Sequence, residues 1–173
     1  MSDSTHEENT ESNAQDAGAA NMTPAVRLAT QDDYAAAAHL FQFSMGDTFT
    51  LDRDLWEDVC QNEGYRVLVA EVKNSGVVGV AVLVVNDRIR LSAGTRRRRF
   101  HLDQLIVDPA ERQKGYAHAL LEAAKSLAAK EAPSYIIVNC DFTNVAARRT
   151  YEGADLHLVR QSNDRFEIAF DKQ

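Results

Sequence analysis

Residues 102–117 read LDQLIVDPAERQKGYA, and they combine a strand, a turn and the start of a helix. The apolar run that ends at Val107 is followed by Asp108 and Pro109, and proline cannot continue the hydrogen-bond ladder of a strand. Residues 112–117 then open a helix with a glycine, Gly115, at the fourth position. No side chain shields the backbone N–H groups there, and the positive end of the helix dipole also attracts anions. The segment therefore predicts a strand followed by an anion site suited to a pyrophosphate.

Hydrophobic periodicity predicts the elements on either side of this segment. Residues 100–140 read as strand, helix, strand, whose natural connection is a right-handed parallel crossover. Hairpins before and after this unit make the other strand pairs antiparallel, so we expect a mixed α/β fold. The expected strands cover residues 25–29, 65–72, 77–85, 100–107, 135–140, 156–160 and 165–170, and the expected helices cover residues 30–44, 52–61, 113–130 and 144–151.

Residues 86–99 do not fit this periodicity. They contain Arg88, Arg90 and a run of four arginines from Arg96 to Arg99, with Gly94 as a breaker. We interpret them as a long solvated connection whose ends could extend the flanking strands. The arginine run itself could be a solvated loop, or it could bind a cofactor phosphate, an acidic partner or nucleic acid.

Composition places the chain among globular proteins. It has 173 residues, of which 45% are hydrophobic and 26% charged, and it contains only 8 Gly and 3 Pro. Collagenous and low-complexity classes are thereby excluded, and no apolar run approaches the roughly 18 residues that span a bilayer. Cys60 and Cys140 form no Cys-x-x-Cys motif, so we expect no zinc site, no other metal and no disulfide framework. With no secretory leader pattern, we expect a reducing, cytoplasmic setting.

The net charge of −7 is unevenly distributed. Residues 1–24 hold five acidic and no basic residues, which leaves 19 basic against 21 acidic residues in 25–173. We predict a disordered acidic tail over 1–24, because it has little to bury, and a single domain over 25–173. A general nucleic-acid binder usually has a basic body, so nucleic acid is an unlikely partner.

The segment and its context resemble the Gcn5-related N-acetyltransferase (GNAT) superfamily over nearly all of residues 25–173. The resemblance is carried by residues 102–109, by Arg112-x-x-Gly115-x-Ala117, and by Asn144 with Tyr151-Glu152 on the next short helix. It implies a mostly antiparallel sheet of about seven strands with about four helices. Its two central parallel strands would splay apart and hold acetyl-CoA between them.

The resemblance also implies which residues bind this co-substrate. The backbone of Leu105, Ile106 and Val107 would pair with the pantetheine arm like an added strand. Asn144 and Tyr151 would lie near the pantetheine and its sulfur. The pyrophosphate cradle would be formed by Arg112, Gln113, Lys114, Gly115, Tyr116, Ala117 and His118. One departure is Asp155-Leu156 where family members often have Gly-Phe, and Asp tolerates left-handed backbone better than most residues.

Acetyl transfer to an amine needs a base for the amine and an acid for the departing thiolate. Tyr151 follows Asn144 by seven residues, two helical turns, so both share a face and Tyr151 is the candidate acid. Asp103 interrupts an apolar strand two residues before Leu105 and is the candidate base, with His101 as the alternate. Strand alternation places Asp103, His101 and Val107 on one face. Tyr151 could instead anchor its helix in the core, and Asp103 could be a structural acceptor or an exposed edge charge.

We therefore expect an acetyl-CoA-dependent N-acetyltransferase that acts on a primary amine of a small molecule or peptide. The alternative is a non-catalytic acyl-CoA-binding sensor or partner module on the same fold. An RNA-directed acetyltransferase is disfavoured by the near-neutral body and acidic tail. The chain could also form a homodimer, as many relatives do, and we expect no membrane partner.

Overall fold

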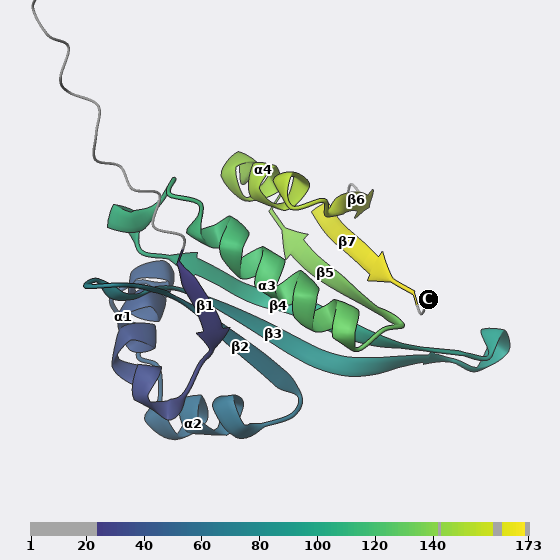
Figure 1. Ribbon diagram of the computed structural model, residues 1–173, viewed down its shortest axis with the longest axis horizontal. Helices are drawn as coiled ribbons and strands as arrows, with labels where there is room; N and C mark the ends of the chain where they lie inside the picture. The colour runs from purple at the N-terminus through teal and green to yellow at the C-terminus, as the bar shows by residue number, and fades with distance from the viewer. Residues whose placement is uncertain (1–23, 142, 161–163, 172–173) are drawn as a thin grey trace, which may run out of the picture.

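The computed structural model describes residues 24–141, 143–160 and 164–171. Within these residues the chain forms one seven-stranded sheet in the order β1-β2-β3-β4-β5-β7-β6, with four α-helices (Figure 1). The strands are β1 Ala25–Leu28, β2 Tyr65–Val72, β3 Gly76–Arg90, β4 Thr95–Val107, β5 Ser134–Cys140, β6 His157–Arg160 and β7 Asp164–Phe170. The helices are α1 Tyr34–Met45, α2 Arg53–Gln61, α3 Tyr116–Lys130 and α4 Val145–Gly153. The expected mixed α/β fold is confirmed.

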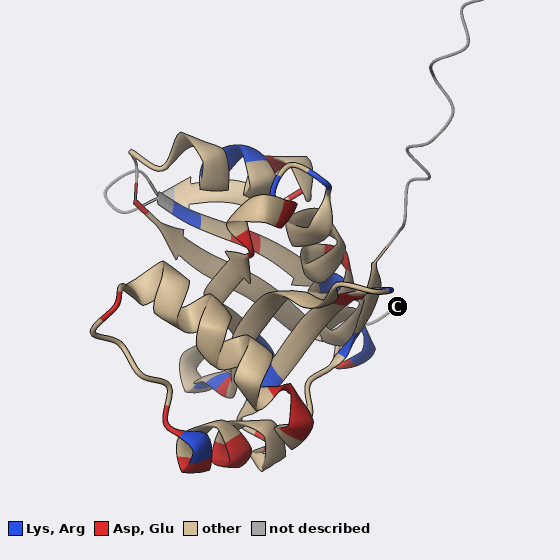
Figure 2. Ribbon diagram, turned by 90° about the vertical axis from the view of Figure 1, so that its left-hand side faces the viewer, with Lys and Arg blue, Asp and Glu red and all other residues tan. Residues whose placement is uncertain are grey.

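Helices cover both faces of the sheet and divide the core in two (Figure 1). On one face, α3 and α4 cover a cluster that includes Phe100 and Phe166, both fully buried, which we call the α3 cluster. On the other face, α1 and α2 cover a smaller cluster around Trp56 and Val80, which we call the α1 cluster. α1 carries no Asp, Glu, Lys or Arg, so the charges at its end of the molecule lie on α2 and the loops (Figure 2). Burial of apolar side chains on both faces fixes the strands in place.

The two central strands run parallel and then separate. β4 and β5 pair from Arg98 opposite Ser134 to Leu102 opposite Val138. Beyond that pair, residues 103–107 have β3 on one side and no partner strand among the described residues on the other. Pairing ends where β4 also contains a β-bulge. The expected splayed pair is thus present.

The bulge lies at Asp103, which has no partner on β3 because Gln104 faces Val82 and Leu102 faces Leu83. An extra residue reverses the alternation of side chains along a strand. Leu105 and Val107 consequently pack against the α3 cluster. The expectation that His101, Asp103 and Val107 share one face is therefore wrong, since His101 precedes the bulge and points to the opposite side from Leu102.

Residues 86–99 form a β-hairpin, which we call the arm. β3 and β4 pair as far as Arg90 opposite Thr95, with a short turn at Leu91–Ala93, and the arm extends beyond the body of the sheet (Figure 1). The expectation of a long solvated connection is wrong for most of its length. Asp87 stabilises the pairing because it forms ion pairs with both Arg96 and Arg98 across the strands.

Residues 1–23 and the expected turn at 161–163 lie outside the described residues.

The C-terminus of α4 shows how the chain accommodates Asp155, which has φ 61° in the left-handed region. The N–H of Leu156 donates to the carbonyl of Tyr151 at 3.0 Å and closes the helix end. Leu156 is 1% exposed and packs in the core beneath α3 and α4.

Candidate active site

The loop between β4 and α3 presents free backbone amides at the helix start. Gly115 is the N-cap of α3, with φ 86°, and Gln113 two residues earlier also has a positive φ of 62°. The first helical hydrogen bond runs from the N–H of Ala119 to the carbonyl of Gly115. The N–H groups of Tyr116, Ala117 and His118 precede it and have no carbonyl partner within the helix. This arrangement is typical of an anion cradle.

Space for an anion exists at the same point. A Cβ added to Gly115 would have no heavy atom within 4 Å, so the glycine is required by its backbone conformation and borders open space. The side chain of Tyr116 is buried in the α3 cluster and holds the helix start against the sheet. A pyrophosphate therefore fits the residues present here.

Three side chains of the cradle each contact a neighbouring side chain. Lys114 Nζ lies 2.9 Å from Glu111 Oε2, and His118 Nε2 lies 3.8 Å from Glu122 Oε1. The guanidinium of Arg112 lies 5.5 Å from the ring centroid of Phe43, a half-exposed residue near the end of α1. Backbone amides, with Arg112 beside them, are thus the main groups left to meet an anion.

The cradle adjoins the unpaired edge of β4. Arg112 Nε donates to the carbonyl of Val107 at 3.4 Å, so the loop folds back onto the last residue of the strand. The side chains of Leu105 and Val107 pack into the α3 cluster, and Ile106 packs into the α1 cluster. The strand is therefore anchored on both faces while its edge toward β5 has no strand partner. An extended chain can add to such an edge.

His101 and Asp103 lie at the point where the strands separate. His101 Nε2 lies 3.3 Å from Asn139 Nδ2 on β5. Partial burial lowers the pKa of His101, and the nearby Arg99 and Arg165 lower it further, whereas Asp103 opposes them. The imidazole is therefore neutral at pH 7 and able to accept a proton. Asp103 is exposed, and its carboxylate contacts Gln104 Nε2 at 3.4 Å.

Tyr151 and Asn144 lie at opposite ends of α4. Asn144 is its N-cap, as expected, since its Oδ1 accepts from the N–H of Ala147 at 3.0 Å, and this leaves the Nδ2 donors for another partner. Tyr151 is 8% exposed and packs against Phe166 with ring centroids 5.6 Å apart. Burial raises the pKa of Tyr151 to about 12. The hydroxyl therefore stays protonated at physiological pH, as an acid must, but its ring belongs to the core.

The sequence analysis missed two residues near His101, Asn139 and Arg165. Asn139 is an exposed polar residue in the otherwise apolar β5, and that interruption was the available signal. Arg165 on β7 had no signal, because its proximity to His101 depends on strand order rather than on spacing along the chain.

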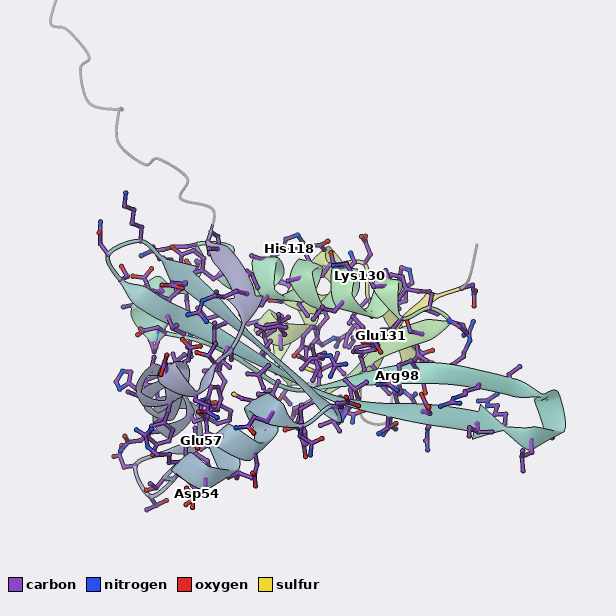
Figure 3. All side chains as sticks on the ribbon, turned by 60° about the horizontal axis from the view of Figure 1, so that its bottom comes forward. Asp54, Glu57, Arg98, His118, Lys130 and Glu131 are labelled. Atoms are coloured by element: carbon purple, nitrogen blue, oxygen red, sulfur yellow. The ribbon has the colours of Figure 1, made fainter. Side chains whose placement is uncertain are left out.

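The arginine run, Arg96 to Arg99, lies near the C-terminal end of α3, away from the cradle. Arg98 Nε lies 3.0 Å from Glu131 Oε2, just after the C-terminal end of α3, whereas His118 lies near its other end (Figure 3). A helix of 15 residues is about 22 Å long, so the run lies far from the cradle. This position does not support binding of a cofactor phosphate there.

Two features are absent from the residues that the structure describes. No helix among them is long and apolar enough to cross a membrane. That part of the chain also contains no group of three or more His, Cys, Asp or Glu side chains placed to hold a metal ion.

Comparisons with known proteins agree with this geometry. Three solved structures have the same fold: an N-acetyltransferase from Staphylococcus aureus Mu50 (16% identity, TM-score 0.66, covering 84% of this chain and 97% of that one), yncA from Salmonella typhimurium with its cofactor acetyl-CoA (20%, 0.67, 87% and 96%), and the ribosomal-protein-S18-alanine N-acetyltransferase from Escherichia coli (17%, 0.63, 86% and 95%). No curated protein matches. The family model for the acetyltransferase (GNAT) family matches residues 34–154. The chain therefore belongs to the GNAT acetyltransferase family.

Proposed function

We propose that the protein is an acetyl-CoA-dependent N-acetyltransferase that transfers the acetyl group to a primary amine of a small molecule or peptide. The observation that carries the proposal is the separation of β4 from β5 after Leu102 and Val138, next to the free amides at Gly115. Together they offer an unpaired strand edge and an anion cradle that follow one another along the chain. The acetyl-CoA found with yncA and the activity in the name of the Escherichia coli relative support the same reading.

In this proposal the cradle and the β4 edge share the binding of the co-substrate. The amides of residues 113–118 and the side chain of Arg112 hold the pyrophosphate, and the backbone of residues 105–107 pairs with the pantetheine amides. The Nδ2 group of Asn144 donates to the same arm. Acetyl-CoA supplies a thioester, whose carbonyl carbon is the acyl donor.

The amine must lose a proton to become a nucleophile, because an alkyl ammonium is only about 0.04% neutral at pH 7. We assign this proton to the pair His101 and Asp103, with the neutral imidazole as acceptor and the carboxylate beside it. Backbone N–H groups at the β4 edge polarise the carbonyl. The new C–N bond forms as the C–S bond breaks, and the hydroxyl of Tyr151 gives its proton to the thiolate and is restored from solvent.

One observation favours the non-catalytic alternative. Tyr151 is nearly buried and its pKa of about 12 makes it a weak acid toward a thiolate. If the hydroxyl only packs, the strand edge and the cradle could bind acyl-CoA without turnover, as a sensor would.

A panel of primary amines and free-amine peptides incubated with acetyl-CoA separates the two functions. An enzyme releases free thiol in equal amounts to N-acetyl product, detected by mass spectrometry, with at least one acceptor. Binding of acetyl-CoA by calorimetry, with thiol release at the hydrolysis background for every acceptor, would establish the sensor instead.

A further inference from the structure

One part of the sheet is not covered by helices and is rich in arginine. It lies on the face opposite α3, where Arg88 on β3 is directly across from Arg97 on β4. The parallel register places Arg99 beside Tyr135, and the antiparallel register places Arg165 across from Asn139. Arg96 and Arg98 point to the other face of the arm. The alternation thus gathers half of the arginine run with arginines from two other strands.

An open hollow of about 520 Å³ lies on this face beside Arg88, Arg97 and Arg165, and Arg99 lies outside its lining. Its lining includes Arg88, Arg90, Arg97, Tyr135, Arg165 and Glu167. Such a volume is within the roughly 300–1,000 Å³ typical of ligand sites. The hollow is therefore large enough for several groups of a ligand.

Positive charge in the hollow is only partly balanced. Arg165 Nη2 lies 3.3 Å from Glu167, and Arg97 pairs with Asp171. Within residues 24–141, 143–160 and 164–171, no carboxylate pairs with Arg88, Arg90 or Arg99. In contrast, Arg96 and Arg98 on the other face meet Asp87 and Glu131. The unbalanced cations all lie on the uncovered face.

Two of these guanidinium groups also hold buried donors that lack an acceptor. The Nε atoms of Arg99 and Arg165 are inaccessible and have no hydrogen-bond partner in the described part of the chain. Buried polar groups are normally hydrogen-bonded. Arg165 is held through its Nη2 by Glu167, whereas no carboxylate among the described residues pairs with Arg99, so the Nε donors of both side chains remain without an acceptor.

The arginine face continues to the point where β4 and β5 separate. Arg165 is across from Asn139, whose Nδ2 contacts His101, and both Arg99 and Arg165 act on the charge of that imidazole. In the proposed function the co-substrate approaches from the α3 side of the gap. An acceptor amine must then reach the thioester from the other side, past Arg99 and Arg165.

We propose that the acceptor is a peptide with a free α-amine and acidic residues just after it. This inference rests on the proposed function, because it names the acceptor of that reaction. Its carboxylates would pair with the row that runs from Arg165 to Arg90. From His101 to Thr95 is six residues of strand, about 20 Å, which an extended peptide of about six residues matches and a small amine does not. A nucleic acid fits less well, because Glu167 lines the hollow, Asp171 pairs with Arg97, and the whole chain is acidic.

The test compares three octapeptides with free α-amines that carry Asp and Glu, Asn and Gln, or Lys at positions three to six. Acetylation is measured as kcat/KM with the wild type, with Arg88→Gln/Arg97→Gln, and with Lys73→Gln/Arg96→Gln. The last variant also loses two positive charges, but one is in the distant β2–β3 turn and the other is on the opposite face of the arm. Melting curves confirm that all three proteins are folded. Binding of a labelled, N-terminally blocked acidic peptide is followed by fluorescence anisotropy.

We expect the wild type to prefer the acidic over the amide peptide by roughly tenfold, because several exposed ion pairs, each individually weak, add together. The preference should fall to within about twofold in Arg88→Gln/Arg97→Gln, stay in the control, and decrease with salt. Equal rates for the acidic and amide peptides, or a preference that survives Arg88→Gln/Arg97→Gln, would overturn the proposal. So would displacement of the labelled peptide by a short RNA at lower concentration than by the unlabelled peptide.

The measurement of peptide binding separates this inference from the proposed function. If no peptide is acetylated but the labelled peptide binds the wild type and not Arg88→Gln/Arg97→Gln, the acidic-peptide site stands and the transferase assignment fails. If peptides are acetylated without regard to charge, the transferase stands and the acidic-peptide site fails.

Discussion

The imidazole Nε2 of His101 lies 3.3 Å from the amide Nδ2 of Asn139, across the two parallel strands where they begin to separate. An amide nitrogen is only a donor, so this contact is a hydrogen bond only while Nε2 carries no proton. Burial lowers the pKa of His101, Asp103 opposes this shift, and Arg99 and Arg165 lower the pKa further. A neutral imidazole is thus held where β4 and β5 begin to separate, and the proposed function uses it as the base.

Replacing His101 and Asp103 separately should show which group accepts the proton. With His101 as base, His101→Gln should lower kcat by roughly 10²-fold and remove the acidic limb of the pH–rate profile. In the wild type that limb should have its midpoint below pH 6.5, because the pKa of His101 is lowered. Asp103→Asn removes the carboxylate that opposes this shift, so the limb should move to still lower pH with a smaller loss of kcat. The opposite pattern, a 10²-fold loss in Asp103→Asn alone, would make Asp103 the base.

Gly115→Glu should weaken acetyl-CoA binding by at least tenfold, or about 1.4 kcal/mol. The new carboxylate enters the open space beside the free amides and repels the pyrophosphate. Gly76→Glu is a matched control, because Gly76 also has a positive φ, 73°, and open space, but it is the first residue of β3, just after the β2–β3 turn. Calorimetry on both folded variants checks the prediction. Equal affinities of the two variants would mean that the amides at Gly115 do not hold the co-substrate.

Tyr151→Phe keeps the ring in the core and removes only the hydroxyl. If Tyr151 donates the final proton, turnover should fall by roughly 10²-fold while the affinity for acetyl-CoA and the melting temperature stay nearly unchanged. Since its pKa is about 12, the hydroxyl should cause no basic limb in the pH–rate profile below about pH 10. Wild-type turnover, measured where chemistry limits the rate, would leave Tyr151 a packing role and solvent as the proton source.

Arg27 should be important for stability, because it holds β1 to the start of α1. Its two terminal nitrogens each lie 2.8 Å from an oxygen of Asp33, which is 7% exposed. Arg27→Met should reduce the free energy of unfolding by about 2 kcal/mol, below the roughly 3–5 kcal/mol of fully buried pairs because Arg27 is itself 40% exposed. Arg53→Met, which loses an exposed pair at 3.9 Å and the contact of its guanidinium with the Tyr34 ring at 4.2 Å, should cost no more than about 1 kcal/mol. Urea unfolding measures both.

The ion pair of Arg27 with Asp33 should make the free energy of unfolding depend on pH. Hydrogen bonds from Arg27 lower the pKa of Asp33, so its contribution to stability is present above the unfolded pKa and is lost as pH falls through the folded one. Arg27→Met should therefore flatten the stability curve below about pH 4, and a curve as steep as that of the wild type would contradict the assignment.

Most of the fold could be predicted from local patterns. Pro109 and Gly115 mark a strand end and a helix start by their own backbone properties; the end of β4 at Val107 was placed correctly, whereas α3 begins at Tyr116, three residues after the predicted start. Asp155 was expected to accept left-handed backbone, and it does so at φ 61°. Each of these features depends on a few neighbouring residues.

The errors arose where pairing across strands decides the structure. The arm was expected to be mostly a connection, because its arginines have no hydrophobic alternation; Asp87 opposite them supplies the missing attraction. The face of His101 was misjudged, because a bulge at Asp103 has no signature in the strand itself. Arg165 and Asn139 meet only through the strand order.

The most direct test of the central claim, that the gap between β4 and β5 holds acetyl-CoA, is a titration of the ¹⁵N-labelled protein with acetyl-CoA followed by amide resonances. The account predicts the largest shifts at the N–H groups of residues 103–107 and 116–118, with the arm and β1 unaffected. Shifts confined to other segments, or saturable binding that leaves the amides of Tyr116, Ala117 and His118 unchanged, would contradict it.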